Sequence, residues 1–229
     1  DNASAKFGNG GDLQLMHDGT DSRIDNMVGH LKIRNYSDNS DIIFETDNGS
    51  GSTTEYFRLD GGDADGTLTY TKWADNSIVT LGASKDLRIY HNGTNSIIQN
   101  YTGDLKIRNG ADDGDIIFDC DDGSGGLETY FFLDGSTGQT RFPDGKILAL
   151  GTGGDLRIQH DSNNSYISQE GTGDLFIRNT TDDKDILLQT DNGSGGVTSY
   201  IQLDGSDLST KILTQKLIIS NLPTSDPGV

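Results

Sequence analysis

One phrase occurs three times in this sequence, and the repeat constrains the fold more than any other feature. The three copies are Asp12-Leu-Gln-Leu-Met-His17, Asp86-Leu-Arg-Ile-Tyr-His91 and Asp155-Leu-Arg-Ile-Gln-His160. Each is followed, in fixed order, by a Leu-x-Ile-Arg-Asn segment, an Asp-Ile-(Ile/Leu)-(Phe/Leu) segment and a Leu-Asp-Gly. Long internal repeats are typical of stacked, elongated proteins, so the sequence favours a structural protein over an enzyme with a single active site.

The three copies keep a close register. The distance from the opening Asp to the Asp of the Asp-Ile segment is 29 residues in the first two copies and 30 in the third. We therefore expect four parts: residues 1–80, the first β repeat with a longer linker; 81–150, the second; 151–220, the third; and 221–229, an extended connector.

Apolar residues alternate with polar ones over short stretches. Leu87, Ile89 and His91 lie on alternate positions, as do Leu105 and Ile107. A period of two over four to six residues is the signature of a half-buried strand, and no stretch keeps a 3.6-residue period over three turns. Strands are therefore expected at 87–91, at 105–108, at the aromatic run 130–133 and at their equivalents in the other copies.

Turn-forming dipeptides separate these stretches. Asn-Gly and Asp-Gly pairs tolerate positive φ and favour tight hairpins. They occur at 18–19, 48–49, 60–61, 92–93, 134–135, 192–193 and 204–205. The chain has 31 Gly but only 3 Pro, which fits turns between short strands better than a disordered linker. The expected fold class is all-β, an elongated repeat of short strands and tight turns.

The apolar content is low for one large core. Leu, Ile, Val and Phe together make up 53 of 229 residues, about 23 %, just above the level of roughly 20 % below which disorder is the better interpretation. Such a chain gains most from a core shared among several copies, so we expect an oligomer of intertwined chains.

The formal net charge of −19 argues against nucleic acid and anionic membranes as partners, because both require a basic surface. We expect neither a signal peptide nor a membrane span, since no apolar run approaches the roughly 20 residues that a spanning helix needs.

Cys120 is the only cysteine, and Thr46 and Thr190 replace it in the other copies. It is expected to be a small apolar filler without redox function.

The histidines His17, His91 and His160 occupy one repeat position and are the candidate metal site. If three chains pack around an axis, each level brings three imidazoles together in a ring that suits a metal or an anion. The simpler interpretation, which we favour, is a histidine at a strand end with its ring nitrogens satisfied locally. No cofactor is expected.

Three matched acidic loops offer a second candidate, at 46–51, 120–125 and 190–195. Calcium loops need oxygen ligands at spaced positions with a closing carboxylate, and only Glu128 is available for closing, so we favour hairpin loops. No nucleophile elbow, phosphate loop or zinc-type spacing is present, and we expect no enzymatic activity and no catalytic residues. Trp73 and Tyr90 have no equivalents at the aligned positions and are the candidate ligand-binding aromatics.

Taken together, the phrases quoted above and the ending Asn221-Leu-Pro-Thr-Ser-Asp-Pro-Gly-Val229 resemble the repeats of tail-fibre-like structural proteins of marine phages, of the cyanophage type. The resemblance covers roughly residues 6–229. It implies an elongated homotrimeric β fibre, either a triple β-helix or stacked small β-sandwiches. It also implies assembly in the host cytoplasm and a place on the virion, outside cells.

The expected function is a non-enzymatic shaft that supports host recognition and attachment. The expected partners are two further copies of the chain, other virion tail proteins and a host cell-surface glycan or protein receptor. Two alternatives stay open. A glycan-binding or polysaccharide-depolymerising tailspike segment requires clustered carboxylates and aromatics, and a secreted calcium-dependent β-repeat protein requires an ion for folding.

Overall fold

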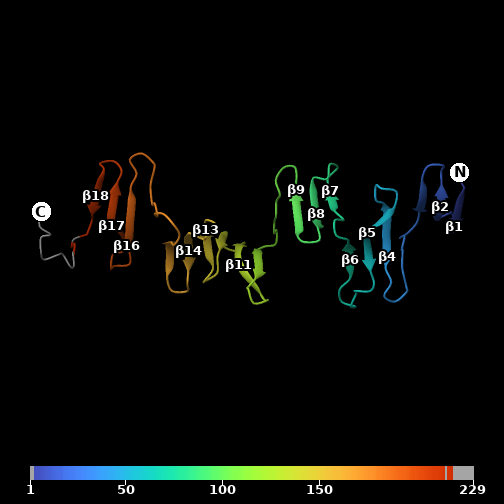
Figure 1. Cartoon of the computed structure of the whole chain (residues 1–229), viewed down its shortest axis with the longest axis horizontal. Coiled ribbons are helices and arrows are strands. Elements are labelled where there is room, and N and C mark those ends of the chain that lie inside the picture. Colours follow the sequence, from blue (N-terminus) through green and yellow to red (C-terminus); the bar gives the residue numbers. More distant parts are fainter. Residues whose placement is uncertain (1–2, 215, 219–229) are drawn as a thin grey trace. The chain divides into compact units, whose positions relative to one another are not determined.

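The computed structural model describes residues 3–214 and 216–218. Within this part the chain forms 18 β-strands and no helix (Figure 1). The strands make six three-stranded antiparallel sheets, each built from three consecutive strands. The expected all-β repeat is therefore confirmed. The chain divides into two units, Asp1–Ile107 and Arg108–Val229, with three sheets in each. The expected connector at 221–229 lies outside the described residues.

Two kinds of sheet alternate along the chain. The first kind, here called the short sheets, has the Asp-Leu-x-Ile-x-His phrase as its central strand. The short sheets are β1 (Ser4–Phe7), β2 (Leu13–His17) and β3 (Ser22–Asn26); β7 (Val79–Leu81), β8 (Leu87–His91) and β9 (Ser96–Asn100); and β13 (Ile147–Leu150), β14 (Leu156–His160) and β15 (Ser165–Gln169).

The second kind, here called the long sheets, begins with the Asp-Ile segment and has the Leu-Asp-Gly phrase at the end of its central strand. The long sheets are β4 (Ile42–Asp47), β5 (Thr53–Asp60) and β6 (Tyr70–Trp73); β10 (Ile116–Asp121), β11 (Leu127–Asp134) and β12 (Gln139–Arg141); and β16 (Ile186–Asp191), β17 (Val197–Asp204) and β18 (Ser209–Ile212). One short and one long sheet, six strands in all, make up each sequence repeat.

Local turn chemistry sets the register of the short sheets. In the β8–β9 hairpin, Gly93 has a φ of +88°. The Oδ1 atom of Asn92 accepts hydrogen bonds from the backbone N–H groups of Thr94 and Asn95, at 3.0 and 2.8 Å. This side-chain turn, expected from the Asn-Gly pair, fixes the pairing of His91 with Ser96 and hence of every residue along the hairpin.

The long sheets each contain one irregularity at the same repeat position. The register of the first two strands shifts between Phe44 and Glu45, between Phe118 and Asp119, and between Leu188 and Gln189. A β-bulge increases the local twist and reverses which side chains face each side of the sheet. In β10 and β11, for example, the shift lies between the apolar pairs of 116–118 with 131–133 and the mainly polar pairs next to the loop.

One group of expected strands is absent from the fold of the single chain. The Leu-x-Ile-Arg-Asn segments at 31–35, 105–109 and 175–179 form neither a turn nor a strand and pair with no strand of the described residues. Their apolar side chains are largely exposed, for example Ile107 at 64 %. The prediction of a strand at 105–108 was therefore wrong for the isolated chain, because alternation describes side-chain direction but does not supply a neighbouring strand.

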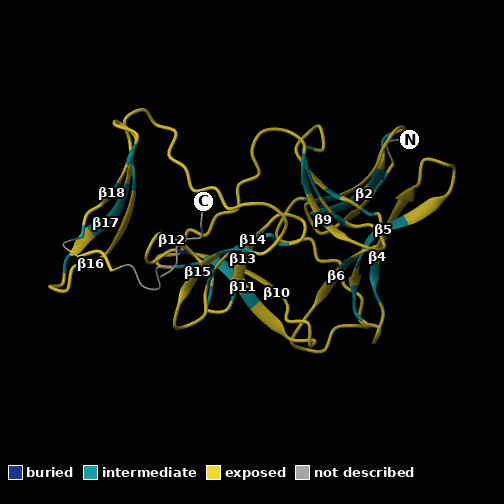
Figure 2. Cartoon of the chain, turned by 60° about the vertical axis from the view of Figure 1, so that its left-hand side comes forward, coloured by how far each residue is buried: buried dark blue, intermediate teal, exposed yellow. Residues whose placement is uncertain are grey.

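The described residues contain no buried hydrophobic side chain, and Figure 2 shows strands that are almost entirely intermediate or exposed. The accessible surface of the chain is 18318 Å². A globular monomer of 24.6 kDa exposes about 10,000 Å². Each sheet is thus ordered by its ladder and turns, while its apolar side chains lack the cover that normally stabilises a domain.

Candidate functional site

The most extensive feature of the chain is a set of uncovered apolar sheet faces. Residues that pair across antiparallel strands lie on the same face, so Val79, Ile89 and Ile98 form one row across β7, β8 and β9. Leu81 and Leu87 form the next row. Ile98 is 61 % exposed and Leu81 53 %. The opposite face of the same sheet carries Thr80, Arg88 and Gln99 and is mainly polar.

The other two short sheets repeat this division into an apolar and a polar face. Their apolar faces consist of Ala5, Phe7, Leu13, Leu15 and Ile24 in the first sheet, and Leu148, Leu150, Leu156, Ile158 and Ile167 in the third. A hollow of about 470 Å³ lies over the third of these faces.

The long sheets carry an aromatic ladder on their apolar face. In the first copy, Phe57 of β5 stacks on Phe44, with ring centroids 4.4 Å apart, and on Trp73, at 4.8 Å. In the second copy the central Phe131 stacks on Phe118 at 4.4 Å and on Phe142 at 5.6 Å. Aliphatic residues take these places in the third copy, where Leu188, Ile201 and Ile212 are paired.

This register places the candidate aromatic Trp73 within the repeat. Trp73 pairs with Phe57, as Ile212 pairs with Ile201 in the third copy. The equivalence of Trp73 and Ile212 cannot be seen by aligning the repeats, because the linker before Trp73 is longer than the corresponding linkers. The other candidate, Tyr90, pairs with Ile97 on the mainly polar face of its short sheet, away from His91. The two aromatics therefore lie on different sheets and do not form a common site.

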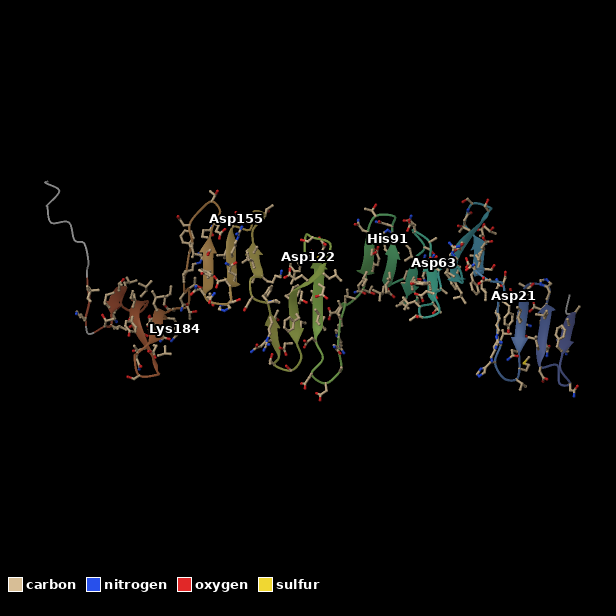
Figure 3. All side chains as sticks on the ribbon, turned by 90° about the horizontal axis from the view of Figure 1, so that it is seen from below. Asp21, Asp63, His91, Asp122, Asp155 and Lys184 are labelled. Atoms are coloured by element: carbon tan, nitrogen blue, oxygen red, sulfur yellow. The ribbon has the colours of Figure 1, made fainter. Side chains whose placement is uncertain are left out.

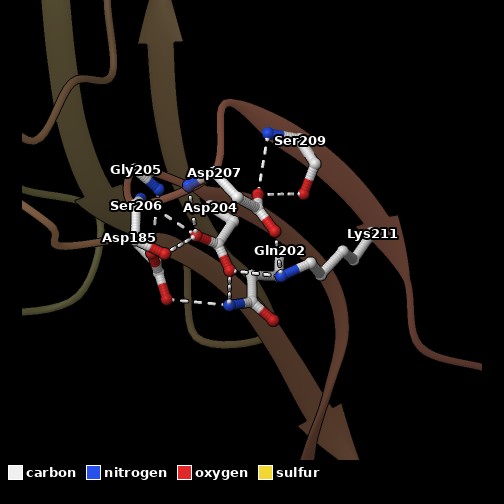
Figure 4. Close-up of polar contacts among 8 residues, drawn as sticks. All are labelled: Asp185, Gln202, Asp204, Gly205, Ser206, Asp207, Ser209 and Lys211. Atoms are coloured by element: carbon white, nitrogen blue, oxygen red, sulfur yellow. Dashed lines mark hydrogen bonds and ion pairs between the residues drawn. The ribbon is translucent and has the colours of Figure 1, made fainter.

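A polar cluster closes one end of each long sheet, and the third copy shows it fully (Figure 4). Asp185 accepts a hydrogen bond from the N–H of Gly205 at 3.0 Å. Asp204 accepts bonds from the hydroxyl of Ser206 at 2.7 Å and from the ammonium group of Lys211 at 2.5 Å. The hydrogen bond from Lys211 is the main cause that holds the pKa of Asp204 well below its ordinary value, and the bond from the Ser206 hydroxyl is the second.

The other copies repeat the cluster with the same geometry. Asp60 pairs with Lys72 at 2.9 Å, and Asp134 pairs with Arg141 at 3.1 Å. Hydrogen bonds from the Asp63 N–H and from Lys72 lower the pKa of Asp60. The largest cause of the lowered pKa of Asp134 is the hydrogen bond from the Ser136 hydroxyl. A cation on the third strand thus faces the Asp of each Leu-Asp-Gly phrase. These carboxylates are occupied in holding strands and turns together.

Each candidate histidine is paired with a serine across its hairpin. The Nδ1 atoms of His17, His91 and His160 lie 3.2, 3.2 and 3.1 Å from serine hydroxyls five residues further along the chain. His91 lies at the end of β8, beside the hairpin (Figure 3). In the sequence, the only sign of these serines, Ser22, Ser96 and Ser165, is their fixed spacing from each histidine.

The three histidines belong to three separate sheets. Each lies on the same sheet face as its apolar neighbours, as expected from the alternation. Among the described residues there is no group of three or more His, Cys, Asp or Glu side chains that could hold a metal ion. A ring of histidines requires three chains at one level, so it stays a prediction about the assembly.

The acidic loops are hairpin loops, as favoured from the sequence, and they connect the first two strands of each long sheet. Their side-chain oxygens bind backbone N–H groups of the same loop. Asp121 accepts a bond from Gly123 at 2.9 Å, and Asp122 accepts bonds from Ser124 at 2.6 Å and Gly126 at 3.1 Å. The bonds from Gly126 and Ser124 lower the pKa of Asp122.

Cys120 is exposed at the start of this loop, so the expectation that it fills an apolar space was wrong for the single chain. It lies after the bulge, in the polar half of β10, where its neighbour across the sheet is Glu128.

Comparisons with protein-family models, with curated proteins and with solved structures give no match to the chain. No helix in the described part of the chain is long and apolar enough to cross a membrane.

Proposed function

We propose that the chain is a non-enzymatic structural segment of a phage tail fibre, a homotrimeric shaft that supports host recognition and attachment. One observation carries the proposal: residues 3–214 and 216–218 include no buried hydrophobic side chain, although every sheet presents an apolar face. An arrangement of this kind becomes stable when further copies of the same chain cover those faces.

The amount of exposed surface supports a permanent assembly. The chain exposes roughly 8,000 Å² more than a globular monomer of its mass. Obligate interfaces bury about 2,000–5,000 Å² or more and resemble a domain core cut in half. Because the six apolar faces recur along the chain, an interface between copies would also extend along the chain rather than forming one patch.

Three copies around an axis fit this pattern. Three three-stranded sheets with their apolar faces turned inward would enclose a core at each level. The polar faces and acidic loops would then lie outside, where the net charge of −19 favours solubility. The choice of three rather than two copies rests on the resemblance to tail-fibre repeats. In a virion the shaft would join other tail proteins and hold a receptor-binding tip away from the particle.

Native mass measurement with a pair of variants tests the proposal. The wild-type chain should give a mass of about 74 kDa, three times 24.6 kDa. Ile98→Asp places a charge on the apolar face of a short sheet and should shift the mass toward the monomer, because an unpaired charge is costly to bury. Thr80→Asp adds the same charge to the opposite, exposed face and should leave the mass unchanged. A stable 24.6 kDa wild-type monomer would refute the proposal.

The place on the virion needs a separate test. Antibodies raised against the purified chain should label the tails of the virions that carry it, and should reduce their adsorption to host cells. Labelling of the capsid alone would contradict a role in the tail. Release of sugar from host polysaccharide by the purified trimer would instead favour a depolymerising tailspike.

A further inference from the structure

We propose that the segments 31–35, 105–109 and 175–179, here called the unpaired segments, are β-strands that add to the sheets of a neighbouring copy of the chain. The inference rests on the proposed oligomer and deepens it by naming the parts of the backbone that join the copies. It does not depend on where the protein acts.

The side chains of the unpaired segments alternate as those of a strand do. Leu105 and Ile107 are apolar and are 48 % and 64 % exposed, with Lys106 between them. The first copy has Leu31 and Ile33 at 48 % and 60 %. A strand with one apolar side matches the composition of the sheets themselves, whose apolar faces are also uncovered.

The backbone of these segments is free for pairing. No backbone–backbone hydrogen bond within the described chain involves residues 31–35, 105–109 or 175–179. An extended backbone with unpaired N–H and C=O groups is the element that completes a sheet edge by β-augmentation. Each three-stranded sheet offers two outer strands, and the outer side of each is unpaired among the described residues.

In the second copy, side chains at both ends hold the segment 105–109 in place. At one end the amide of Asn100 donates to the carbonyls of Thr102 and Gly103, at 2.9 and 2.8 Å. At the other end Asn109 donates to the carbonyl of Asp115 at 2.8 Å and accepts from the N–H of Ala111 at 3.0 Å. These bonds reduce the conformational entropy that pairing must overcome, so the segment is preorganised for a partner.

The bond from the Asn at the second end recurs in both other copies. Asn35 and Asn179 donate to the carbonyls of Asp41 and Asp185, at 2.9 and 3.1 Å. This explains why an Asn ends every Leu-x-Ile-Arg-Asn phrase. No strand of the described residues pairs with any of the three segments, so we assign the partner strand to another copy.

Hydrogen–deuterium exchange on the full chain tests the inference. In the assembled protein alternate amides of 31–35 and 105–109, those that face the partner strand, should exchange at least about a hundredfold more slowly than the amide of Gly93 at its hairpin tip. Buried backbone amides are almost always hydrogen-bonded, so such protection reports pairing. In the Ile98→Asp monomer the same amides should exchange at the unprotected rate, while those of β11 serve as the paired reference.

Each outcome is informative. Slow exchange in the oligomer, with fast exchange in the monomer, supports strand addition between copies. An oligomer whose segments exchange as fast as Gly93 would overturn the inference and leave the proposed shaft intact. Protection that persists in the folded monomer would place the partner strand in the same chain and would also overturn it. A wild-type monomer would remove both proposals together.

Discussion

Replacing Gly61 by Ala should destabilise the first long sheet, because backbone occupies the space of the new side chain. A Cβ at Gly61 would lie 2.5 Å from the carbonyl oxygen of Ser40 and 3.3 Å from its carbonyl carbon. Ser40 belongs to the turn that precedes β4, and Gly61 also donates a hydrogen bond to Asp41 at 2.9 Å. The turn and the end of β5 would therefore have to separate.

The magnitude follows from two opposing effects. Forcing an extra methyl into a packed site costs about 1–3 kcal/mol. Replacing Gly by Ala at an unstrained position stabilises by about 0.4–1 kcal/mol, because the unfolded chain loses entropy. The neighbouring Gly62 supplies the matched control, since its nearest atoms would lie at 3.6 and 3.7 Å, which is ordinary contact. Gly61→Ala and Gly62→Ala should thus differ by about 2–3 kcal/mol in free energy of unfolding.

Because the chain has a single tryptophan, its fluorescence reports the unfolding of one sheet. Trp73 is the only Trp in the chain and stacks on Phe57 in the same sheet. Its fluorescence during urea unfolding, at one fixed protein concentration, reports this sheet. Equal stability of the two variants, within about 0.5 kcal/mol, would refute the idea that the turn packs directly on Gly61.

Three further predictions concern the repeated polar contacts. Lys211 lowers the pKa of Asp204 in the folded state, so the ionised carboxylate stabilises the fold fully above the unfolded pKa of about 4, and this stabilisation is lost as the pH falls below that value. In Asp204→Asn the melting temperature should therefore depend less on pH between about pH 2 and 5 than in the wild type. Asn109→Ala removes two hydrogen bonds and should cost about 1–2 kcal/mol in urea unfolding, with Asn109→Asp intermediate. Tyr130→Phe removes the bond from its hydroxyl to the carbonyl of Asp121 and should cost at most about 1 kcal/mol in the same assay.

Each of these has a contradicting result. An acid transition of Asp204→Asn that matches the wild type would show that the Asp204 cluster does not control acid stability. Unfolding of Asn109→Ala at the wild-type urea concentration would remove the basis for holding the unpaired segment in place. A loss well above 1 kcal/mol for Tyr130→Phe would mean that the hydroxyl makes contacts beyond this one bond.

Much of the local structure could be predicted from the sequence. The alternation around Ile89 and the Asn92-Gly93 turn together predict a hairpin, and the structure contains it. The shared face of His91 and its apolar neighbours follows from the same period of two. These features depend on residues a few positions apart, so the covalent geometry of strand and turn is enough to determine them.

Contacts across the linkers could not be predicted in this way. The third strand of each long sheet follows a linker of variable length, so its register was not available from the sequence. The structure shows that Trp73 completes an aromatic ladder and that Lys72 faces Asp60. The pairing of a cation with the Asp of each Leu-Asp-Gly phrase was missed for the same reason.

The sequence by itself determined the period of the repeat and the turns, because these depend on local backbone preferences and side-chain alternation. Only the tertiary structure decided which strands pair. It left 105–109 unpaired and every sheet without a buried apolar face in the described chain. The physical reason is that alternation sets the direction of side chains, whereas pairing and burial require a second surface, and one chain does not provide it.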